Sequence, residues 1–267
     1  MSDVMLQEQI DAATAYEELF IPAVFGQWAP LVAQAANLEP GQRVLDVACG
    51  TGILAREAAK CVGTAGEVTG LDMTPGMLAV AEQLAPDIAW QQGVADKLPF
   101  PEESFDAVVS QFGLMFFPDR PKALREMLRV LVPGGRVAIA VFDALENHSA
   151  YAEEVALFES MISSQAADAI RIPFGLGDKA GLKHLAEDAG LTSVSVATQE
   201  GVAKFPSLRT LVEADLRGWL PVMGIQLDEA KIEAVLAEAE NVMRFCVNEQ
   251  GGAELPLFVH IVQGSKA

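Results

Sequence analysis

Three aspartates accompany three successive short apolar runs in the first half of the chain. Asp46 lies in the run 43–48, Asp72 ends the next run, and Asp96 follows the third. Short apolar runs that alternate with helical patterns are typical of parallel strands joined by helices. Ligands of such sheets bind beyond the carboxyl ends of the strands. A turn carboxylate or a helix cap explains each aspartate singly, but three strand ends together favour one binding site.

A glycine-rich turn follows the first of these strands and contains Ala48, Cys49, Gly50 and Gly52. Glycines at the N-terminus of a helix let backbone approach a ligand. The spacing also satisfies a loose dinucleotide fingerprint. A nicotinamide-dependent oxidoreductase is therefore one alternative function, and a non-catalytic cofactor-binding protein is another, because binding a cofactor does not by itself require a catalytic residue.

The carboxylate of Asp46 favours a different ligand. On the strand just before the turn it would repel a pyrophosphate, and it would suit a cationic head such as the ammonium and sulfonium of S-adenosylmethionine. Asp72 can accept hydrogen bonds from ribose hydroxyls, and Asp96 can accept one from the adenine amino group. Met73 and Met77 are placed to pack against the adenine.

Four segments carry a family resemblance: VLDVACGTG, GLDMTPGML, GVADKLPFPEESFDAVVSQFGLMFFPD and LRVLVPGGRVAIAVF. In order and spacing, over about residues 41–142, they resemble the class I S-adenosylmethionine-dependent methyltransferases. The likeness is greatest to the branch of ubiquinone/menaquinone biosynthesis methyltransferases. Ala48 replaces the first glycine of the family's commonest turn.

The resemblance implies both a site and a fold. Asp46 and the turn 50–52 would hold the methionyl part of the cofactor, Asp72 the ribose, and Ala95 with Asp96 the adenine. The backbone around Gln111 would also face the cofactor. The implied fold is α/β and Rossmann-like, a seven-stranded mostly parallel sheet with its last strand antiparallel and helices on both faces.

The chain reads as one domain over residues 1–267. An N-terminal helical segment (1–40) precedes the cofactor-binding core (41–142). Helices are expected over 53–61, 120–131 and 178–189, and strands over 43–48, 67–72, 88–95, 105–111, 136–142, 192–204 and 255–262. Two further helical stretches, 143–177 and 207–249, read as insertions that form a lid, with a dimer interface as the alternative for the second.

The methyl acceptor is expected to be a small organic molecule that is methylated at oxygen, carbon or nitrogen. The sequence Ser110-Gln111-Phe112-Gly113 lacks the prolines that hold a planar nitrogen in amide and exocyclic-amine methyltransferases, and no Pro-Cys dipeptide occurs. Apolar and aromatic residues are placed to line an acceptor pocket: Tyr16, Phe20, Phe112 and Met115.

One histidine is a candidate general base. His148 follows the fifth strand closely, and an imidazole suits proton transfer near neutral pH. The alternative is an exposed loop histidine. Asp143, Glu146 and His148 lie near one another, but their spacing is not diagnostic of a metal site, and we expect no metal.

Charge and composition exclude several partners. The chain has 18 basic and 37 acidic residues, a net charge of −19, and 51% hydrophobic residues. Only −3 of that charge falls within residues 43–142. Such a balance disfavours nucleic-acid and anionic-membrane partners. Without a basic leader, a long apolar span or a CxxC pair, we expect a cytoplasmic monomer or homodimer.

Overall fold

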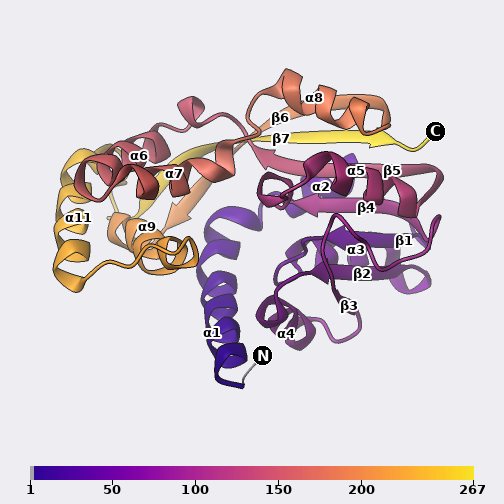
Figure 1. Cartoon of the computed structure of the whole chain (residues 1–267), viewed down its shortest axis with the longest axis horizontal. Coiled ribbons are helices and arrows are strands. Elements are labelled where there is room, and N and C mark those ends of the chain that lie inside the picture. Colours follow the sequence, from indigo (N-terminus) through magenta and orange to yellow (C-terminus); the bar gives the residue numbers. More distant parts are fainter. Residues whose placement is uncertain (1–2) are drawn as a thin grey trace.

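The computed structural model describes residues 3–267, so the first two residues of the expected N-terminal segment lie outside it. Seven strands form one sheet in the order β3-β2-β1-β4-β5-β7-β6, as Figure 1 shows. The strands are β1 (Arg43–Val47), β2 (Glu67–Asp72), β3 (Ala89–Gln92), β4 (Phe105–Gln111), β5 (Leu131–Phe142), β6 (Thr192–Phe205) and β7 (Ala253–Ser265). The first five pair in parallel, and β7 is antiparallel to both β5 and β6. The predicted fold class is confirmed.

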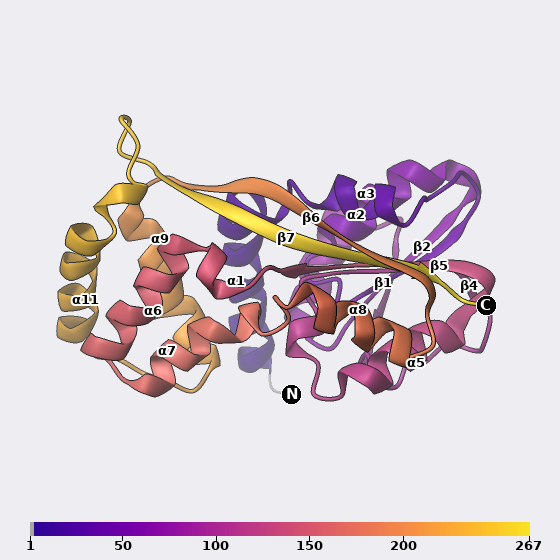
Figure 2. The ribbon, with the colours of Figure 1, turned by 90° about the horizontal axis from the view of Figure 1, so that it is seen from above.

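Helices cover both faces of this sheet. On one face lie α2 (Ala29–Ala35) and α3 (Ile53–Val62), and on the other lie α5 (Arg120–Val130) and α8 (Lys179–Asp188) (Figure 2). Near the β3 edge, α4 (Pro75–Leu84) packs on β2 and β3. The central strands are buried on both sides, which explains why β1 and β4 are apolar in nearly continuous runs.

The N-terminal segment spans the molecule from the β3 edge to the β6 edge. It consists of α1 (Asp3–Phe20), a π-helical turn η1 (Ile21–Phe25) and α2. α1 lies against α4 so closely that a side chain on Gly76 would meet the backbone of Gln9 at 2.5 Å. At the other end, the Gln27 amide bonds the backbone of Val202 on β6.

The two predicted helical insertions pack together beyond the far ends of β6 and β7, which are long enough to reach them (Figure 2). We call residues 149–174 and 208–246 the helical subdomain. It contains α6 (Ser149–Met161), α7 (Ser164–Arg171), α9 (Leu208–Ala214), the π-helical η6 (Asp215–Trp219), α10 (Leu220–Val222) and α11 (Glu229–Val242). The remaining short helical turns are η2 (Gly63–Ala65), η3 (Leu114–Phe116), η4 (Leu145–Asn147), η5 (Ile172–Phe174) and η7 (Arg244–Cys246).

Several element boundaries differ from the expected ones. β4 matches its expected range, whereas β3 covers only residues 89–92 of the expected 88–95. The Pro-Gly-Gly sequence that was expected to separate α5 from β5 lies inside β5. There the pairing with β4 shifts register, and Gly134 has a φ of +77°. A β-bulge explains the difference, because it holds extra residues within a strand.

Candidate active site

The turn between β1 and α3 is held in left-handed backbone conformations. Ala48, Gly50 and Gly52 have φ values of +58°, +55° and +87°. A side chain on Gly50 would meet nothing described within 4 Å, whereas one on Gly52 would collide with the Trp90 indole. The backbone at Gly50 is therefore accessible to a ligand. Gly52 lacks a side chain where the Trp90 ring packs against the turn.

Asp46 is buried at the end of β1, with 1% of its surface exposed. Neither carboxylate oxygen has a hydrogen-bond partner among the described residues. Burial raises the pKa of this carboxyl well above its usual range; the Ala55 backbone partly opposes that shift, and the nearby Asp72 adds to it. A carboxyl in this state favours a cationic ligand, whose charge would offset the desolvation.

The carboxylate of Asp72 accepts hydrogen bonds from two different turns. Its Oδ2 accepts a hydrogen bond from the Gly50 N–H at 2.9 Å, and its Oδ1 accepts one from the Thr74 N–H at 2.8 Å. Each oxygen keeps a second lone pair for a ligand hydroxyl. Burial raises the pKa of the nearby Tyr16 phenol, and the charges of Glu17 and Asp72 raise it further.

The expected adenine-binding residues lie beside an open pocket of about 360 Å³, which Met73 lines with Lys97 and Pro99 among others. Met73 is 66% exposed, so its side chain is free to cover a ring. Asp96 pairs with Lys122 of α5 at 3.4 Å, and Ala95 beside it is half-buried. Met77 is half-buried on α4. The structure thus brings Met73 to this pocket and gives Asp96 a cationic partner.

Several buried polar atoms near the turn have no hydrogen-bond partner among the described residues. Besides Asp46 they include Thr51 Oγ1, Ser110 Oγ and Gln111 Oε1. The Gln111 Nε2 donates to the Phe25 carbonyl at 3.1 Å, which leaves its oxygen free. Unpaired buried polar atoms are rare, and a ligand commonly satisfies them. These free oxygens could accept hydrogen bonds from the ammonium and hydroxyl groups of S-adenosylmethionine, so the residues present fit this cofactor.

A row of aromatic rings leads from α1 to the helical subdomain. Phe112, at the end of β4, adopts a φ of +56° and lies 5.2 Å from Phe25 and 4.5 Å from Phe142, centre to centre. Other neighbouring pairs in the row include Tyr16–Phe20 (5.9 Å), Tyr16–Phe25 (5.5 Å), Phe142–Phe174 (5.4 Å) and Phe174–Tyr151 (5.3 Å). Three of the four expected pocket residues belong to this row. The fourth, Met115, is 2% exposed and packs in the core.

His148 is buried, not an exposed loop residue, with 1% exposure. Its Nδ1 lies 3.0 Å from the Ala144 carbonyl, and its Nε2 contacts the backbone of Phe258, accepting from the N–H at 3.0 Å. Burial lowers its pKa, with weaker opposing effects from these backbone bonds. Because both ring nitrogens are occupied by backbone, we do not retain His148 as a general base.

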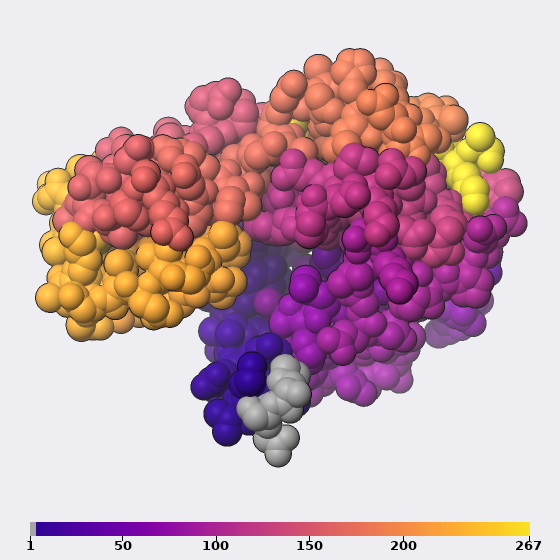
Figure 3. Space-filling view, viewed as in Figure 1, coloured from indigo at the N-terminus to yellow at the C-terminus, as the bar shows by residue number. Residues whose placement is uncertain are grey.

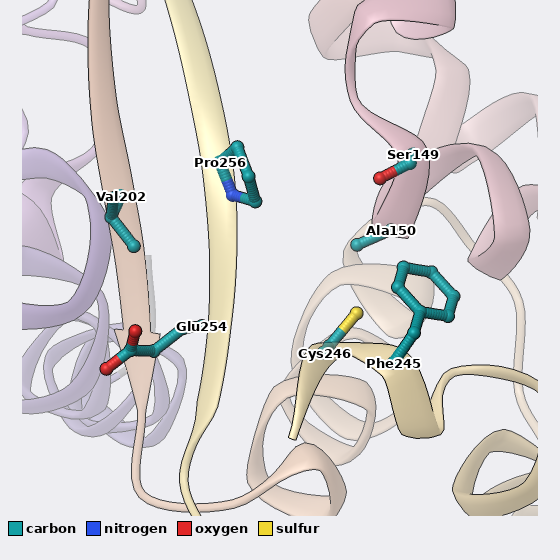
Figure 4. Close-up of a pocket in the computed structure, with 7 residues that line it drawn as sticks. All are labelled: Ser149, Ala150, Val202, Phe245, Cys246, Glu254 and Pro256. Atoms are coloured by element: carbon teal, nitrogen blue, oxygen red, sulfur yellow. The ribbon is translucent and has the colours of Figure 1, made fainter. Parts of the chain in front are cut away.

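A hollow separates the helical subdomain from the sheet, with α1 beside it (Figure 3). The two parts also touch through aromatic rings: Phe116 in η3 lies 5.6 Å from Trp219 in η6, centre to centre. A second pocket, of about 370 Å³, lies where β6 and β7 meet α6 and η7 (Figure 4). Its lining comes from those elements, not from the turn or α1, so we assign it no part in cofactor binding.

Sequence reasoning missed two carboxyls of the helical subdomain, Glu154 and Asp215. Glu154 is 0% exposed, and apart from the carboxyl of Asp215 no hydrogen-bond donor among the described residues serves its oxygens. Burial raises the pKa of both carboxyls, that of Asp215 to about 7. The only available signal was an acid within an apolar helical pattern, which is common at surfaces. Within residues 3–267 no group of three or more His, Cys, Asp and Glu is arranged to hold a metal.

Comparison with known proteins agrees with this geometry. Residues 45–139 match a family model described as a methyltransferase domain. The chain is 38% identical over 158 residues to the 2-phytyl-1,4-naphtoquinone methyltransferase of Synechococcus elongatus, covering 56% of this chain and 66% of that protein. It is 32% identical over 190 residues to the ubiquinone/menaquinone biosynthesis C-methyltransferase UbiE of Cellvibrio japonicus, covering 65% of this chain and 76% of that protein. Across the curated relatives that it matches, the chain spans about half to three quarters of their length.

Solved structures share the fold at lower identity. The YcgJ protein of Bacillus subtilis is 21% identical with a TM-score of 0.58, covering 90% of this chain and 98% of that one. A Haemonchus contortus phosphoethanolamine N-methyltransferase is 18% identical with a TM-score of 0.59, covering 96% of this chain and 57% of that one. No helix within residues 3–267 has the length and apolar character to cross a bilayer. By motif, fold and sequence relationship, the chain belongs to the class I S-adenosylmethionine-dependent methyltransferases, in the branch that contains the ubiquinone/menaquinone enzymes.

Proposed function

We propose that this protein transfers the methyl group of S-adenosylmethionine to a small, ring-bearing organic molecule. The observation that carries the proposal is Asp46, a buried and unpartnered carboxyl beside the open backbone of Gly50. Such a carboxyl has to neutralise itself or meet a cation. Family membership and the unpartnered atoms of Ser110 and Gln111 support the same ligand.

The residues of this chain bind and orient the two reactants. The bound cofactor supplies an electrophilic methyl on sulfur, so alignment and exclusion of water account for most of the protein's contribution. Asp46 and the Gly50 backbone hold the charged end, and Asp72 holds the ribose while fixing the turn. Phe25 and Phe112 present apolar ring surface where the turn meets β4. The methylated atom is oxygen, carbon or nitrogen, and quinone-modifying relatives support a ring-bearing acceptor.

The remaining assignments are part of the same proposal. The helical subdomain acts as a lid over the acceptor within a single domain. The protein works in the cytoplasm as a monomer or homodimer, and its net charge of −19 disfavours nucleic-acid and anionic-membrane partners.

Binding and transfer can be tested separately. Titration calorimetry should detect S-adenosylhomocysteine and S-adenosylmethionine binding, and Asp46→Asn should weaken binding of the cationic S-adenosylmethionine by tenfold or more. Asp87→Asn, at an exposed site in the same half of the chain, is the matched control. No binding of either compound would overturn the proposal.

Transfer is tested with methyl-labelled S-adenosylmethionine and a metabolite extract. We expect label in an extractable small molecule and none with Asp46→Asn at low cofactor concentration. Intact binding without label in any fraction would favour the non-catalytic alternative.

A further inference from the structure

One arginine joins the glycine-rich turn to the N-terminal helix. Arg56 lies on α3, and its Nη1 donates to the Thr51 carbonyl of the turn at 2.6 Å. Its Nη2 donates to the Glu17 carboxylate of α1 at 2.7 Å. Because 39 residues separate Glu17 from Arg56, this contact holds two distant segments of the chain together.

The geometry of this ion pair sets it apart from an ordinary surface pair. Exposed pairs contribute little to stability, because water and salt screen them and ordering two long side chains costs entropy. Here the side chains of Arg56 and Glu17 are only 20% and 19% exposed. The planar guanidinium also serves a carbonyl and a carboxylate at once through different nitrogens, which a lysine ammonium cannot do with the same geometry. Arg56 thus fixes the turn and α1 relative to each other.

The peptide that Arg56 holds lies at the centre of the proposed cofactor turn. The Thr51 carbonyl and the Gly52 N–H belong to the same peptide group. That N–H donates to the Cys49 carbonyl at 2.9 Å, while the carbonyl accepts from Arg56. Glycine on one side would otherwise let this peptide rotate easily. Since Asp72 fixes the preceding Gly50 N–H, Arg56 completes the set of bonds that hold the turn in its ligand-accessible shape.

The end of α1 that Arg56 holds borders the same site. Its Tyr16 ring stacks on Phe25 of η1 at 5.5 Å, and the Phe25 carbonyl accepts a hydrogen bond from Gln111 at the end of β4. Toward its start, α1 runs alongside α4 (Figure 1). The last turn of α1 and η1 therefore extend from the glycine turn to the end of β4, and Arg56 provides their tie to the turn.

This arrangement links the position of α1 to cofactor affinity. With α1 in place, the rings of Tyr16 and Phe25 cover the site from the side opposite the strands. If α1 leaves that position for part of the time, the apparent affinity for a ligand falls with the fraction of molecules that are competent to bind. A bond that keeps α1 in place therefore raises affinity without touching the ligand.

We propose that Arg56 is a positioning residue for cofactor binding, which holds the Thr51–Gly52 peptide of the turn and, through Glu17, keeps the end of α1 against the site. This inference rests on the proposed function and adds to it a pair of residues that act on the cofactor through the turn and α1. Breaking the pair should weaken cofactor binding, and cofactor binding should in turn hold α1 more firmly, because such coupling is reciprocal.

Titration calorimetry of the full chain with S-adenosylhomocysteine measures the first effect. Arg56→Gln and Glu17→Gln should each weaken binding about fivefold or more, the lower end of typical coupling between linked events. The double variant should lose no more than about twofold beyond Arg56→Gln, because both substitutions break one ion pair and their effects cannot add. Amide hydrogen exchange measures the second effect: S-adenosylhomocysteine should slow the exchange of residues 13–20, and Arg56→Gln should speed it in the free protein.

Arg43→Gln is the matched control, since Arg43 also pairs with a carboxylate of a distant segment, Asp106 at 3.0 Å. That pair lies at the start of β1, at the opposite edge of the sheet from the turn. Arg43→Gln should lower the Tm and leave both the affinity and the exchange of α1 unchanged. Should Arg56→Gln fail to fold, Arg56→Lys keeps the charge and is compared with Arg43→Lys in the same way.

Three results would overturn the inference: unchanged affinity in either single variant, an equal loss in the Arg43 control, or exchange of α1 that does not respond to S-adenosylhomocysteine. Failure of the unmodified protein to bind S-adenosylhomocysteine would instead overturn the proposed function.

Discussion

The side-chain amide of Gln27 pairs with the backbone of Val202 as a neighbouring strand would. Its Nε2 donates to the Val202 carbonyl at 3.0 Å, and its Oε1 accepts from the Val202 N–H at 3.1 Å. β6 is an edge strand, whose free backbone groups would otherwise be open to another chain. One side chain thereby attaches the N-terminal segment to the strand that leads into the helical subdomain.

Gln27→Glu should lower the free energy of unfolding by about 1 kcal/mol, because a carboxylate cannot donate to the Val202 carbonyl. Urea unfolding at pH 7 measures the loss, and hydrogen exchange of the Val202 amide should stay protected. Gln34→Glu makes the same charge change at an exposed position on α2. An equal loss in both variants would show that charge alone is responsible.

Asp72→Asn should weaken S-adenosylhomocysteine binding about tenfold or more, since hydrogen bonds to charged groups contribute roughly 1.5–3 kcal/mol. The change removes an acceptor for either Gly50 or Thr74 and the charge from the expected ribose site. Calorimetry measures the affinity, with Asp87→Asn as the control. Unchanged affinity would mean that Asp72 serves the turn alone.

Ala48→Gly should stabilise the protein. An L-residue in the left-handed region costs about 1–2 kcal/mol, and glycine avoids that cost while losing part of the gain to a more flexible unfolded chain. We expect a net gain of about 1 kcal/mol, or roughly 2–4 °C in Tm. Ala55→Gly, within α3, should instead lose about 1 kcal/mol. Destabilisation by Ala48→Gly would show that the Ala48 methyl, which lies 2.7 Å from the position of a side chain on Gly113, is needed for packing.

Because the pKa of His148 is lowered in the folded protein, we expect stability to depend on pH. Burial lowers its pKa from 6.5, so below pH 6.5 the unfolded chain binds a proton that the folded protein does not. The contribution of His148 to the free energy of unfolding should therefore be fully present above pH 6.5 and be lost as the pH drops toward the lowered pKa.

Chemical denaturation between pH 5 and pH 8 tests this expectation. His148→Gln should be less stable at pH 8, having lost buried hydrogen bonds, and should show a flatter decline below pH 6.5. His184→Gln, at an exposed position on α8, should behave as the unmodified protein does. An identical slope in His148→Gln would assign the acid sensitivity to other groups.

The part of the chain up to β5 was predictable because the sequence patterns that indicate its strands and turns are local. β1 and β4 are buried on both faces, and their apolar runs gave the correct positions within a residue. Parallel strands then placed Asp46 and Asp72 at one edge of the sheet, where they lie within electrostatic reach of each other. The bulge in β5 was missed because Pro-Gly-Gly indicates a turn as strongly as it indicates a bulge.

The part of the chain after β5 was less predictable, because its contacts join segments that are distant in the sequence. Nothing in the sequence around Glu154 shows that Asp215 faces it, since each acid lies in a stretch with other acids. His148 illustrates the opposite error: its position after β5 suggested chemistry, but the backbone of Phe258 occupies its ring. Burial of a polar residue depends on the partner segment, which local spacing does not reveal.

The helical subdomain and the proposed cofactor site come from different parts of the chain. Its first part lies between β5 and β6 and its second between β6 and β7, whereas the turn, Asp46 and Asp72 all precede it in the chain. If the helical subdomain contacts the acceptor, as we propose, substitutions after β5 should change what is methylated while the methyl donor stays the same. A chimera that exchanges residues 143–252 between relatives should carry acceptor preference with the exchanged segment.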